Sequence, residues 1–452
     1  MKPYASYKPS GVPWLGDVPA HWAGKRLRDC VEGCSNGVWG DDPDGGDDDI
    51  PVIRVADFDR VSRQVVEYET LRKVDSGQRG SRALVPGDML MEKSGGGEQQ
   101  PVGMVVSYLG PEGAVCSNFV ARMRSREGVV SRFMVYLHAY LYASRVTNIS
   151  VKQTTGIQNL DSTAYLSEAC FVPPPEEQQA IADYLDAETA RIDTLIYEKD
   201  GLIGLLREWR QSVIAEAVTK GLDKTVAMKP SGVPWLGDVP AHWAVEKLKF
   251  FVGFAGGGTP SKDNPAYWEG AIPWVSPKDM KRPRISETED YITEEGQLNS
   301  PCVLIPPMSV LTVVRSGILQ HSIPVALNVV PVALNQDMKA LLLSERADCR
   351  FLAYEISGCQ KELREAWVKQ GATVESIEHQ RMADSQLALP PLQEQQAIAD
   401  YLDTETAKID DLIAHTHDEI ALLKELRAAT IADAVLGRID VRGSAKTIAA
   451  CA

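Results

Sequence analysis

The chain has 452 residues, enough for two or three domains of ordinary size. Its content of 44% hydrophobic and 24% charged residues is typical of a soluble globular protein and excludes a disordered chain. Acidic residues outnumber basic ones by 62 to 47, a net charge of −15, which excludes polyanion binding through bulk charge. Any contact with nucleic acid therefore requires local basic patches.

Composition also indicates the compartment. No apolar run reaches the ~18 residues of a membrane span, and the start, MKPYASYKPSGVPW, lacks the apolar stretch of a signal peptide. We therefore expect a cytoplasmic protein with no membrane contact. The eight cysteines contain no CxxC pair, so the sequence favours reduced, hydrophobic cysteines and predicts no metal site.

Two segments of the chain occur twice. KPSGVPWLGDVPAHWA stands at residues 8–23 and again, letter for letter, at 229–244. PPPEEQQAIADYLDAETARIDTLI at 173–196 matches PPLQEQQAIADYLDTETAKIDDLI at 390–413, an offset of 217. Between these segments the two copies diverge almost completely. The duplication predicts one scaffold, built twice, that presents different surfaces to two ligands or to two parts of one ligand.

The elements predicted in chain order are two mixed domains and two long helices. Residues 1–172 and 224–389 combine β-branched runs with short helical patterns, which predicts an α+β fold for each. Residues 173–223 and 390–440 predict long helices, because prolines mark both starts and acidic first turns complement the helix dipole. Residues 441–452 are a tail.

Each predicted helix carries an apolar stripe at alternating steps of three and four residues, which is typical of a heptad coiled coil. The stripe has a polar middle in both helices, and Gly201 and Gly204 weaken the first helix locally. The expected core positions of the two helices are Leu185, Ile192, Leu195, Leu202, Leu206, Trp209, Leu402, Ile409, Leu412, Leu423 and Leu426.

The two helices are expected to pack antiparallel. A helix of about forty residues is about 60 Å long, whereas the roughly 165 residues between the helices form a domain about 40 Å across. Parallel packing would require this domain to begin at one end of the first helix and finish at the other. The expected fold is therefore two pseudo-repeated α+β domains, separated by two long helices that pack as an antiparallel coiled coil.

Most of the excess acid lies in the helical segments, whereas both mixed domains are nearly neutral and contain basic stretches. One stretch covers 101–152, where six cations meet Glu112 and Glu127 alone among acidic residues. The other consists of Lys278, Lys281, Arg282 and Arg284. Such patches can neutralise phosphates, although each residue could equally lie on an ordinary solvated face.

Two pairs of loops could approach DNA. KQTTGIQNL (152–160) and KQGATVESI (369–377) align at the 217 offset, and each combines a cation, an amide and a glycine that lets the backbone approach a groove. The alternative is an ordinary turn before the last strand. The glycine-rich EKSGGGEQQ (92–100) and FAGGGTPSK (254–262) could follow a phosphate backbone or could be flexible surface loops.

Several separate segments resemble, in family order, the specificity subunit of type I restriction-modification systems. They are SGVPWLGDVPAHW, GGGTPSKDNPAYWEGAIPWVSPKDM, LNQDMKAL and PPLQEQQAIADYLD. In that family two target recognition domains each read one half of a split, asymmetric DNA sequence, and antiparallel helices set the spacing. The resemblance implies a non-catalytic subunit that binds double-stranded DNA, two methyltransferase subunits and restriction subunits. It also implies that S-adenosylmethionine, ATP and Mg²⁺ bind the partner subunits and not this chain.

The resemblance and the loops together give a set of expected DNA contacts. These are Lys93, Ser94, Lys152, Gln153, Thr154, Thr155, Gly156, Thr259, Lys278, Arg315, Lys369, Gln370 and Thr373.

An enzyme that acts on DNA unaided is the first alternative. NPAY at 264–267 resembles the Asn-Pro-Pro-Tyr motif of amino-methyltransferases but lacks the second proline, and no glycine-rich cofactor loop accompanies it. Asp279 and Lys281 mimic the D-x-K pattern of nucleases, which is common by chance. Nuclease or methyltransferase activity of the isolated chain would support this class.

A bivalent coiled-coil adaptor that binds proteins is the second alternative. In this interpretation the recurring Trp14, Trp22, Trp235 and Trp243 dock partners, or serve architecture that both copies share. Lack of any DNA affinity would distinguish an adaptor from a DNA-specificity subunit.

Overall fold

The computed structural model of the chain describes residues 2–97, 99–154, 156–369 and 374–443. They form two compact units: unit 1 holds the residues up to Glu198 and those from Asp418 on, and unit 2 is Lys199–His417. The first long helix, α4 (Pro175–Lys220), and the second, α9 (Leu392–Val435), each contribute one half to each unit. Helix α4 continues through Gly201 and Gly204 without a break.

Unit 1 is built around a mixed sheet. Its strands are β1 (Tyr7–Pro9), β2 (Asp17–Pro19), β3 (Ala23–Arg26), β4 (Val31–Asn36), β5 (Asp49–Ile53), β6 (Phe58–Asp59), β7 (Gln64–Val65), β8 (Leu71–Lys73), β9 (Met89–Glu92), β10 (Ser94–Gly95), β11 (Val105–Ser107), β12 (Val115–Cys116), β13 (Val120–Ser125), β14 (Val151–Thr154), β15 (Ile157–Leu160) and β16 (Ala169–Val172). Its short α-helices are α1 (Ser76–Arg79), α2 (Ser131–Ala143) and α3 (Ser162–Leu166). The central sheet has the order β4-β13-β9-β11-β7-β6, with β11 parallel to β7.

Unit 2 repeats this plan. Its strands are β17 (Met228–Pro230), β18 (Asp238–Pro240), β19 (Ala244–Lys247), β20 (Val252–Gly256), β21 (Trp268–Val275), β22 (Arg284–Ile285), β23 (Asp290–Ile292), β24 (Val310–Val313), β25 (Val325–Asn328), β26 (Ala333–Leu334), β27 (Met338–Leu343) and β28 (Gln386–Leu389). Its short α-helices are α5 (Glu294–Leu298), α6 (Cys349–Gly358), α7 (Gln360–Trp367) and α8 (His379–Asp384). The central sheet, β20-β27-β24-β25-β22, matches the first five strands of the unit 1 sheet, including the parallel last pair.

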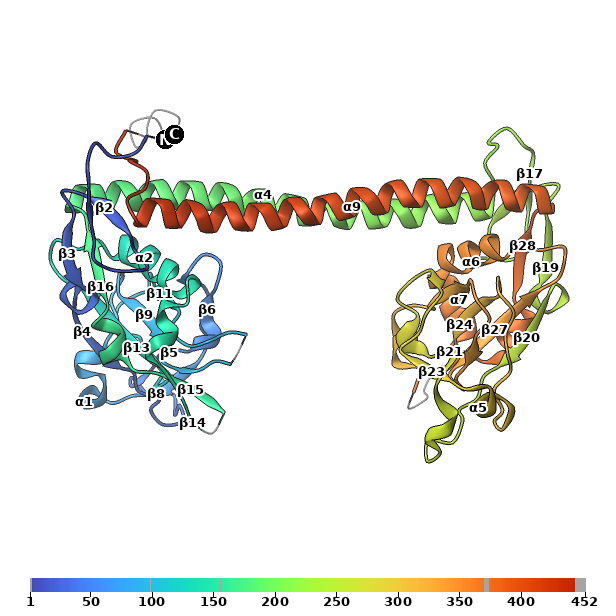
Figure 1. Cartoon of the computed structure of the whole chain (residues 1–452), viewed down its shortest axis with the longest axis horizontal. Coiled ribbons are helices and arrows are strands. Elements are labelled where there is room, and N and C mark those ends of the chain that lie inside the picture. The colour runs from blue at the N-terminus through green and yellow to red at the C-terminus, as the bar shows by residue number, and fades with distance from the viewer. Residues whose placement is uncertain (1, 98, 155, 370–373, 444–452) are drawn as a thin grey trace. The chain divides into compact units, whose positions relative to one another are not determined.

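In each unit one short helix connects the sheet to the long helices. Helix α2 contacts β11 and α6 contacts β25, on the side of the sheet that faces the long helices (Figure 1). Gln178 of α4 accepts a hydrogen bond from the Val130 amide just before α2, and Gln395 of α9 accepts one from the Asp348 amide just before α6. The α+β prediction is confirmed for both units. No helix in the described ranges is both long and apolar enough to cross a membrane.

The repeated segment 8–23 binds the start of a long helix through a buried tryptophan. In unit 1 the Trp22 indole Nε1 donates to Glu177 Oε1 at 2.9 Å, and the His21 ring nitrogen lies 2.7 Å from Glu177 Oε2. In unit 2 Trp243 and His242 contact Glu394 in the same way, at 3.0 and 2.8 Å.

The same tryptophans pack against the end of the other long helix. Gly437, just beyond α9, and Gly221, just beyond α4, adopt left-handed backbone conformations with φ of 68° and 74°. A Cβ at Gly437 would lie 3.1 Å from the Trp22 ring, and one at Gly221 would lie 3.2 Å from the Trp243 ring. Since Trp22 and Trp243 are fully buried, they serve shared architecture rather than an exposed docking surface.

A row of isoleucines forms the buried seam of the long helices. Ile181, Ile192, Ile203 and Ile214 in α4, and Ile398, Ile409, Ile420 and Ile431 in α9, follow at intervals of eleven residues, and all eight are buried. Eleven residues in three turns is about 3.67 residues per turn, which is closer to a straight α-helix than a heptad is. The seam therefore has an eleven-residue period rather than the predicted seven.

The heptad prediction is wrong at four positions for this reason. A heptad stripe drifts around a straight helix by about 20° every seven residues, so later positions leave the buried face. Leu202, Trp209, Leu412 and Leu426 are exposed. Of the other predicted core residues, Leu185, Ile192, Leu206, Leu402 and Ile409 are buried, and Leu195 and Leu423 are partly buried.

The long helices run antiparallel, as expected. In unit 1 Arg427 Nε donates to Asp193 Oδ1 at 2.8 Å, and in unit 2 Arg210 Nε donates to Asp410 Oδ1 at 2.9 Å. Arg210, the later of the two α4 residues, thus pairs with Asp410, the earlier of the two α9 residues, as antiparallel helices require. At the 217 offset Asp193 corresponds to Asp410 and Arg210 to Arg427, so the two ion pairs are copies of one interaction.

The seam predicts different effects for two adjacent residues of α4. Ile203 is 3% exposed and Leu202 is 43% exposed. We expect Ile203→Ala to lower the free energy of unfolding by about 2–5 kcal/mol because it leaves a cavity. Leu202→Ala should change it by about 0.5 kcal/mol or less. Denaturant titration followed by circular dichroism measures both; equal effects would contradict the eleven-residue seam.

A buried histidine predicts how the stability of unit 1 depends on pH. His138 lies in α2 with its Nδ1 2.6 Å from the Tyr165 hydroxyl, and burial lowers the pKa of His138 to about 4. The unfolded chain takes up this proton below its ordinary pKa of about 6.5, whereas the folded chain does not. Stability should therefore be complete above pH about 6.5 and fall by about 3 kcal/mol as the pH approaches 4.

Thermal melts of the wild type and His138→Gln between pH 8 and 4 test this dependence. The transition that the substitution shifts at pH 8 belongs to unit 1. That transition should lose part of its pH dependence in His138→Gln. An unchanged slope would show that another group causes it.

Candidate nucleic-acid interface

In unit 1 the structure brings two of the predicted loops into one small sheet. Strand β10 pairs with β15, and β15 pairs with β14, so Lys93 and Ser94 lie beside the hairpin 151–160. Ser94 Oγ and Asn159 Oδ1 are 2.5 Å apart. Strands β14 and β15 lie at the end of unit 1 that is farthest from α4 (Figure 1).

The two lysines of this sheet have polar partners; Lys152 is exposed and Lys93 is partly buried. Lys93 Nζ donates to Asn36 Oδ1 at 2.8 Å, and Lys152 Nζ donates to Asp161 Oδ2 at 2.8 Å. Gln153 is exposed, and the exposed Gly156 has φ of 85°, which favours glycine. The backbone of Thr154 pairs with Ile157. Thr155 lies outside the described residues.

In unit 2 three of the predicted contacts lie along one polar strip. Arg315 forms a β-bridge with Ser376, whose carbonyl accepts a hydrogen bond from the Lys369 amide at 2.9 Å. Arg315 Nε also donates to Asp337 Oδ1 at 2.8 Å. Thr259 Oγ1 hydrogen-bonds to the neighbouring Gln336. Gln370 and Thr373 lie outside the described residues.

Matching backbone hydrogen bonds show that the two surfaces are equivalent. The amides of Lys93 and Ser94 donate to the Phe119 carbonyl at 2.8 and 3.2 Å, and those of Val314 and Arg315 donate to the Asp337 carbonyl at 2.8 and 3.3 Å. The Leu160 amide donates to Lys93 and the Ile377 amide to Val314, both at 2.8 Å. Ser94 thus corresponds to Arg315, and Phe119 corresponds to Asp337.

The rest of the surface follows the same correspondence. The Val38 amide donates to the Cys116 carbonyl and the Gly258 amide to the Leu334 carbonyl, both at 2.8 Å, which places Trp39 and Thr259 at one position. In the 3-10 turns Val55–Asp57 and Pro277–Asp279, the amide that precedes the turn, of Arg54 or Ser276, donates to the Asp carboxylate at 2.7 or 2.8 Å. Ala56 therefore corresponds to Lys278, whose ammonium lies 3.6 Å from Glu289.

The structure also adds residues to this surface that the motifs did not single out. Trp39, Glu92, Ser117 and Phe119 line a pocket beside Ser94 in unit 1. Glu92 begins the glycine-rich segment 92–100, but its burial depends on β9, which the segment does not reveal.

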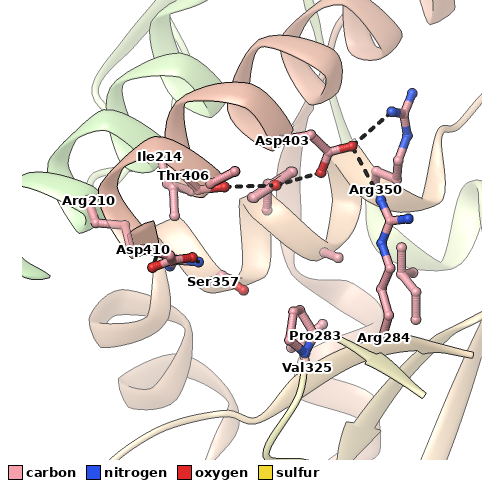
Figure 2. A pocket seen from close by; sticks show the side chains of 14 residues that line it. Arg210, Ile214, Pro283, Arg284, Val325, Arg350, Ser357, Asp403, Thr406 and Asp410 are labelled. Atoms are coloured by element: carbon pink, nitrogen blue, oxygen red, sulfur yellow. Dashed lines mark hydrogen bonds and ion pairs between the residues drawn. The ribbon is translucent and has the colours of Figure 1, made fainter. Parts of the chain in front are cut away.

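A second cavity, of about 340 Å³, lies in unit 2 between α9, α6 and the sheet (Figure 2). Figure 2 shows Arg284 and Arg350 directed at Asp403, to which they lie within 3.5 and 3.0 Å. Tyr354 also donates to Asp403, at 2.7 Å. In unit 1 Arg132 and Tyr136 both contact Asp186 at 2.7 Å, which is the same arrangement. The cavity therefore belongs to the shared frame.

The motifs of the enzyme alternative have structural roles. Asn264 Oδ1 accepts from the Ala266 amide and caps a 3-10 turn before Trp268. Asp279 accepts from the Ser276 amide at 2.8 Å and from the Glu289 amide at 2.9 Å, so its carboxylate closes the local turn. Within the described ranges, no three His, Cys, Asp or Glu residues cluster so that they could hold a metal ion.

Comparison with known sequences identifies relatives over part of the chain and over nearly all of it. Residues 240–422 match the family described as type I restriction modification DNA specificity domain. The type I restriction enzyme EcoR124I/EcoR124II specificity subunit of Escherichia coli is 44% identical over 184 residues, 40% of this chain and 43% of that protein's length. The putative type I restriction enzyme MjaX specificity subunit of Methanocaldococcus jannaschii is 22% identical over 95% of this chain and 96% of that protein.

Solved structures show the same fold. A chain from work on complex assembly and conformational transition of the type I R-M system matches with a TM-score of 0.73 at 18% identity, over 93% of this chain and 99% of that one. The HsdS subunit from Thermoanaerobacter tengcongensis matches with a TM-score of 0.56 at 17% identity, over 93% of this chain and 98% of that one.

The two mixed units share an antiparallel helix pair and carry surfaces that are equivalent in backbone but different in side chains. This combination defines a class of specificity protein with two recognition units. Residues 240–422 match the specificity-domain family, and the chain is similar over part and over nearly all of its length to type I restriction enzyme specificity subunits. The family resemblance of its motifs is thereby confirmed.

Beneath this surface the backbone at Gly257 passes close to the backbone at Asn335. This close approach predicts that substitutions at Gly257 and at the neighbouring Gly256 have different effects on stability. A Cβ at Gly257 would lie 1.9 Å from the Asn335 carbonyl oxygen, whereas one at Gly256 would have no atom within 4 Å. Gly257→Ala should therefore lower the free energy of unfolding by about 2–3 kcal/mol or more. Gly256→Ala is the matched control and should not destabilise the chain. Equal thermal melts of the two variants would contradict the close approach.

Proposed function

We propose that this chain is the DNA-specificity subunit of a type I restriction-modification complex, in which each unit reads one half of a split, asymmetric target. The observation that carries the proposal is the equivalence of the two surfaces. Matching hydrogen bonds hold Ser94 and Arg315, and likewise Trp39 and Thr259, at the same positions of one frame. A repeated frame with different side chains at its presenting edge is suited to reading two different short sequences.

The chemistry of the surfaces favours DNA as the ligand. Lys93 and Lys152 in unit 1, and Lys278, Arg315 and Lys369 in unit 2, supply local cations on a chain whose net charge is −15. Cations of this kind neutralise phosphates and fix the register, while amide and hydroxyl groups beside them read base edges.

The long helices would set the spacing between the half-sites. Helix α4 has 46 residues and α9 has 44, and each continues without interruption. Linking two reading heads makes the second contact intramolecular, so two short half-sites give a specificity that neither supplies alone. Half-sites separated by whole turns of DNA, ~34–36 Å each, would present the same face to both units.

Catalysis would reside in partner subunits. Two methyltransferase subunits would use S-adenosylmethionine, and restriction subunits would use ATP and Mg²⁺, in a cytoplasmic complex around this non-catalytic chain. The structural roles of Asn264 and Asp279 support this division, because both candidate catalytic motifs are used in local turns.

Mapping methylated adenines in cells that carry this chain with methyltransferase partners tests the proposal. We expect a two-part motif with a fixed gap. Arg315→Ala should relax one position in the half read by unit 2 by about tenfold, since one good base contact contributes ~1–3 kcal/mol. Lys361→Ala, which removes an exposed cation of α7, is the charge-matched control. A continuous motif, or equal changes in both halves, would contradict two independent reading heads.

A further inference from the structure

A pocket opens on the candidate surface of unit 1. It has a volume of about 490 Å³ and lies between Trp39, the turn at Val55 and Ala56, the glycine-rich strand β10 and the loop that ends at Phe119. It shares Glu92 and Gly96 with an adjoining hollow lined by Arg60. The volume lies within the roughly 300–1,000 Å³ that is usual for sites that bind small ligands. We call it the Glu92 pocket.

The side chains that line the Glu92 pocket include buried polar atoms that have no hydrogen-bond partner among the described residues. Glu92 is 1% exposed, and its Oε2 has no hydrogen-bond partner among the described residues; the Arg60 guanidinium lies 3.5 Å from it. The buried Ser117 Oγ also has no hydrogen-bond partner in the described part of the chain. Buried polar groups are nearly always hydrogen-bonded in folded proteins. Within the described ranges, the Ser117 hydroxyl without a hydrogen-bond partner, and the Glu92 carboxylate that contacts only the Arg60 guanidinium at 3.5 Å, leave hydrogen-bonding capacity for a ligand.

The rim of the pocket is aromatic and exposed. Trp39 is 38% and Phe119 is 47% exposed, and both side chains line the cavity. The Arg72 guanidinium lies 4.9 Å from the Trp39 ring, which holds the indole in place. Exposed aromatic rings of this kind stack on the faces of planar, unstacked nucleobases. The rim thus favours a flat aromatic ligand over an aliphatic amine.

The pocket is specific to unit 1, although the frame around it is not. The matching hydrogen bonds place the fully buried Val313 of unit 2 where unit 1 has Glu92. Thr259 and Asp337 stand where unit 1 has Trp39 and Phe119. The shared fold therefore does not require a carboxylate or an aromatic rim here. The pocket belongs to the part of the surface that distinguishes the two reading heads.

We propose that the Glu92 pocket receives an unstacked nucleobase that carries an exocyclic amino group, and that the Glu92 carboxyl accepts a hydrogen bond from this group. The inference rests on the proposed function and names one specificity-determining residue of unit 1. Adenine, cytosine and guanine carry such a group, whereas thymine would place a carbonyl oxygen against the carboxylate oxygens, which repel it. Extrusion is required because the carboxyl lies below the surface, beyond the reach of a base that remains in the stack.

The test compares two variants whose expected effects differ in kind. Glu92→Gln keeps the size of the side chain but adds a donor, so the base preference at one position of the unit 1 half-motif should relax by about tenfold or more. Trp39→Ala removes a stacking surface that every base can use, so it should weaken binding about tenfold without altering the motif. Glu112→Gln, an exposed carboxylate of unit 1, is the control and should change neither quantity.

Motif mapping in cells with the methyltransferase partner reads out base preference, and the affinity of the complex for its motif duplex reads out stacking. Glu92→Gln with an unchanged melting temperature and an unchanged motif overturns the inference, and so does relaxation of the unit 2 half. If the wild type yields no two-part motif, the proposed function itself fails.

A second measurement covers the case in which Glu92→Gln does not fold. The wild-type complex is titrated with duplexes in which each adenine, cytosine or guanine of the unit 1 half is replaced in turn by an analogue that lacks the amino group. One position should lose about tenfold or more in affinity. No loss at any position overturns the inference.

Discussion

The isoleucine seam of α4 and α9 is the constraint on which the rest of the structure depends. The largest hydrophobic core of each unit includes both long helices: that of unit 1 includes Ile181 of α4 and Ile431 of α9, and that of unit 2 includes Ile214 and Ile398. Each helix therefore belongs to two cores at once. A change of helical phase in either helix would displace the buried face in both units.

The eleven-residue period suits two helices whose packing must remain regular over their length. A heptad seam keeps its contacts by winding the helices around each other, whereas a period near 3.67 residues per turn needs little supercoiling. The copied ion pairs, Asp193 with Arg427 and Arg210 with Asp410, then fix the register at two points. Their exchange between the helices follows directly from a duplication whose copies pack antiparallel.

At the candidate surface the side chains of the two units differ although the backbone is alike. Strands β9 and β24 end at the same crossing, with the same hydrogen bonds to the loop below, yet one ends in Glu92 and the other in Val313. Backbone hydrogen bonds of this frame do not depend on side-chain identity, so the presented residues are free to vary. In such a frame the backbone interactions that stabilise the unit are separate from the side chains that contact a ligand.

The sequence allowed the α+β class and the antiparallel helix pair to be predicted, but the seam of the helices and the site only in part. Identical segments such as 8–23 and 229–244 indicate identical structure, and the 217 offset already aligns the isoleucines at intervals of eleven. The heptad interpretation failed because leucines such as Leu202 and Leu412 stand beside the seam, and hydrophobicity alone does not distinguish them from the isoleucines. Glu92 could not be identified because its burial depends on strands that diverge between the copies.

The order of the segments along the chain constrains the order in which the two units can fold. In unit 2 the chain continues from Gly221 into β17, whereas in unit 1 the corresponding junction brings together residues that are far apart in the sequence. There the Asp440 amide donates to the Lys2 carbonyl at 2.9 Å, and the Tyr7 hydroxyl donates to the Gly437 carbonyl at 3.1 Å. Unit 2 is one contiguous stretch, Lys199–His417, whereas unit 1 needs residues from both ends. Since domains fold as their residues emerge during synthesis, all of unit 2 is available before unit 1 can close. Unit 1 is thus completed last, by the half of α9 that follows unit 2 in the sequence.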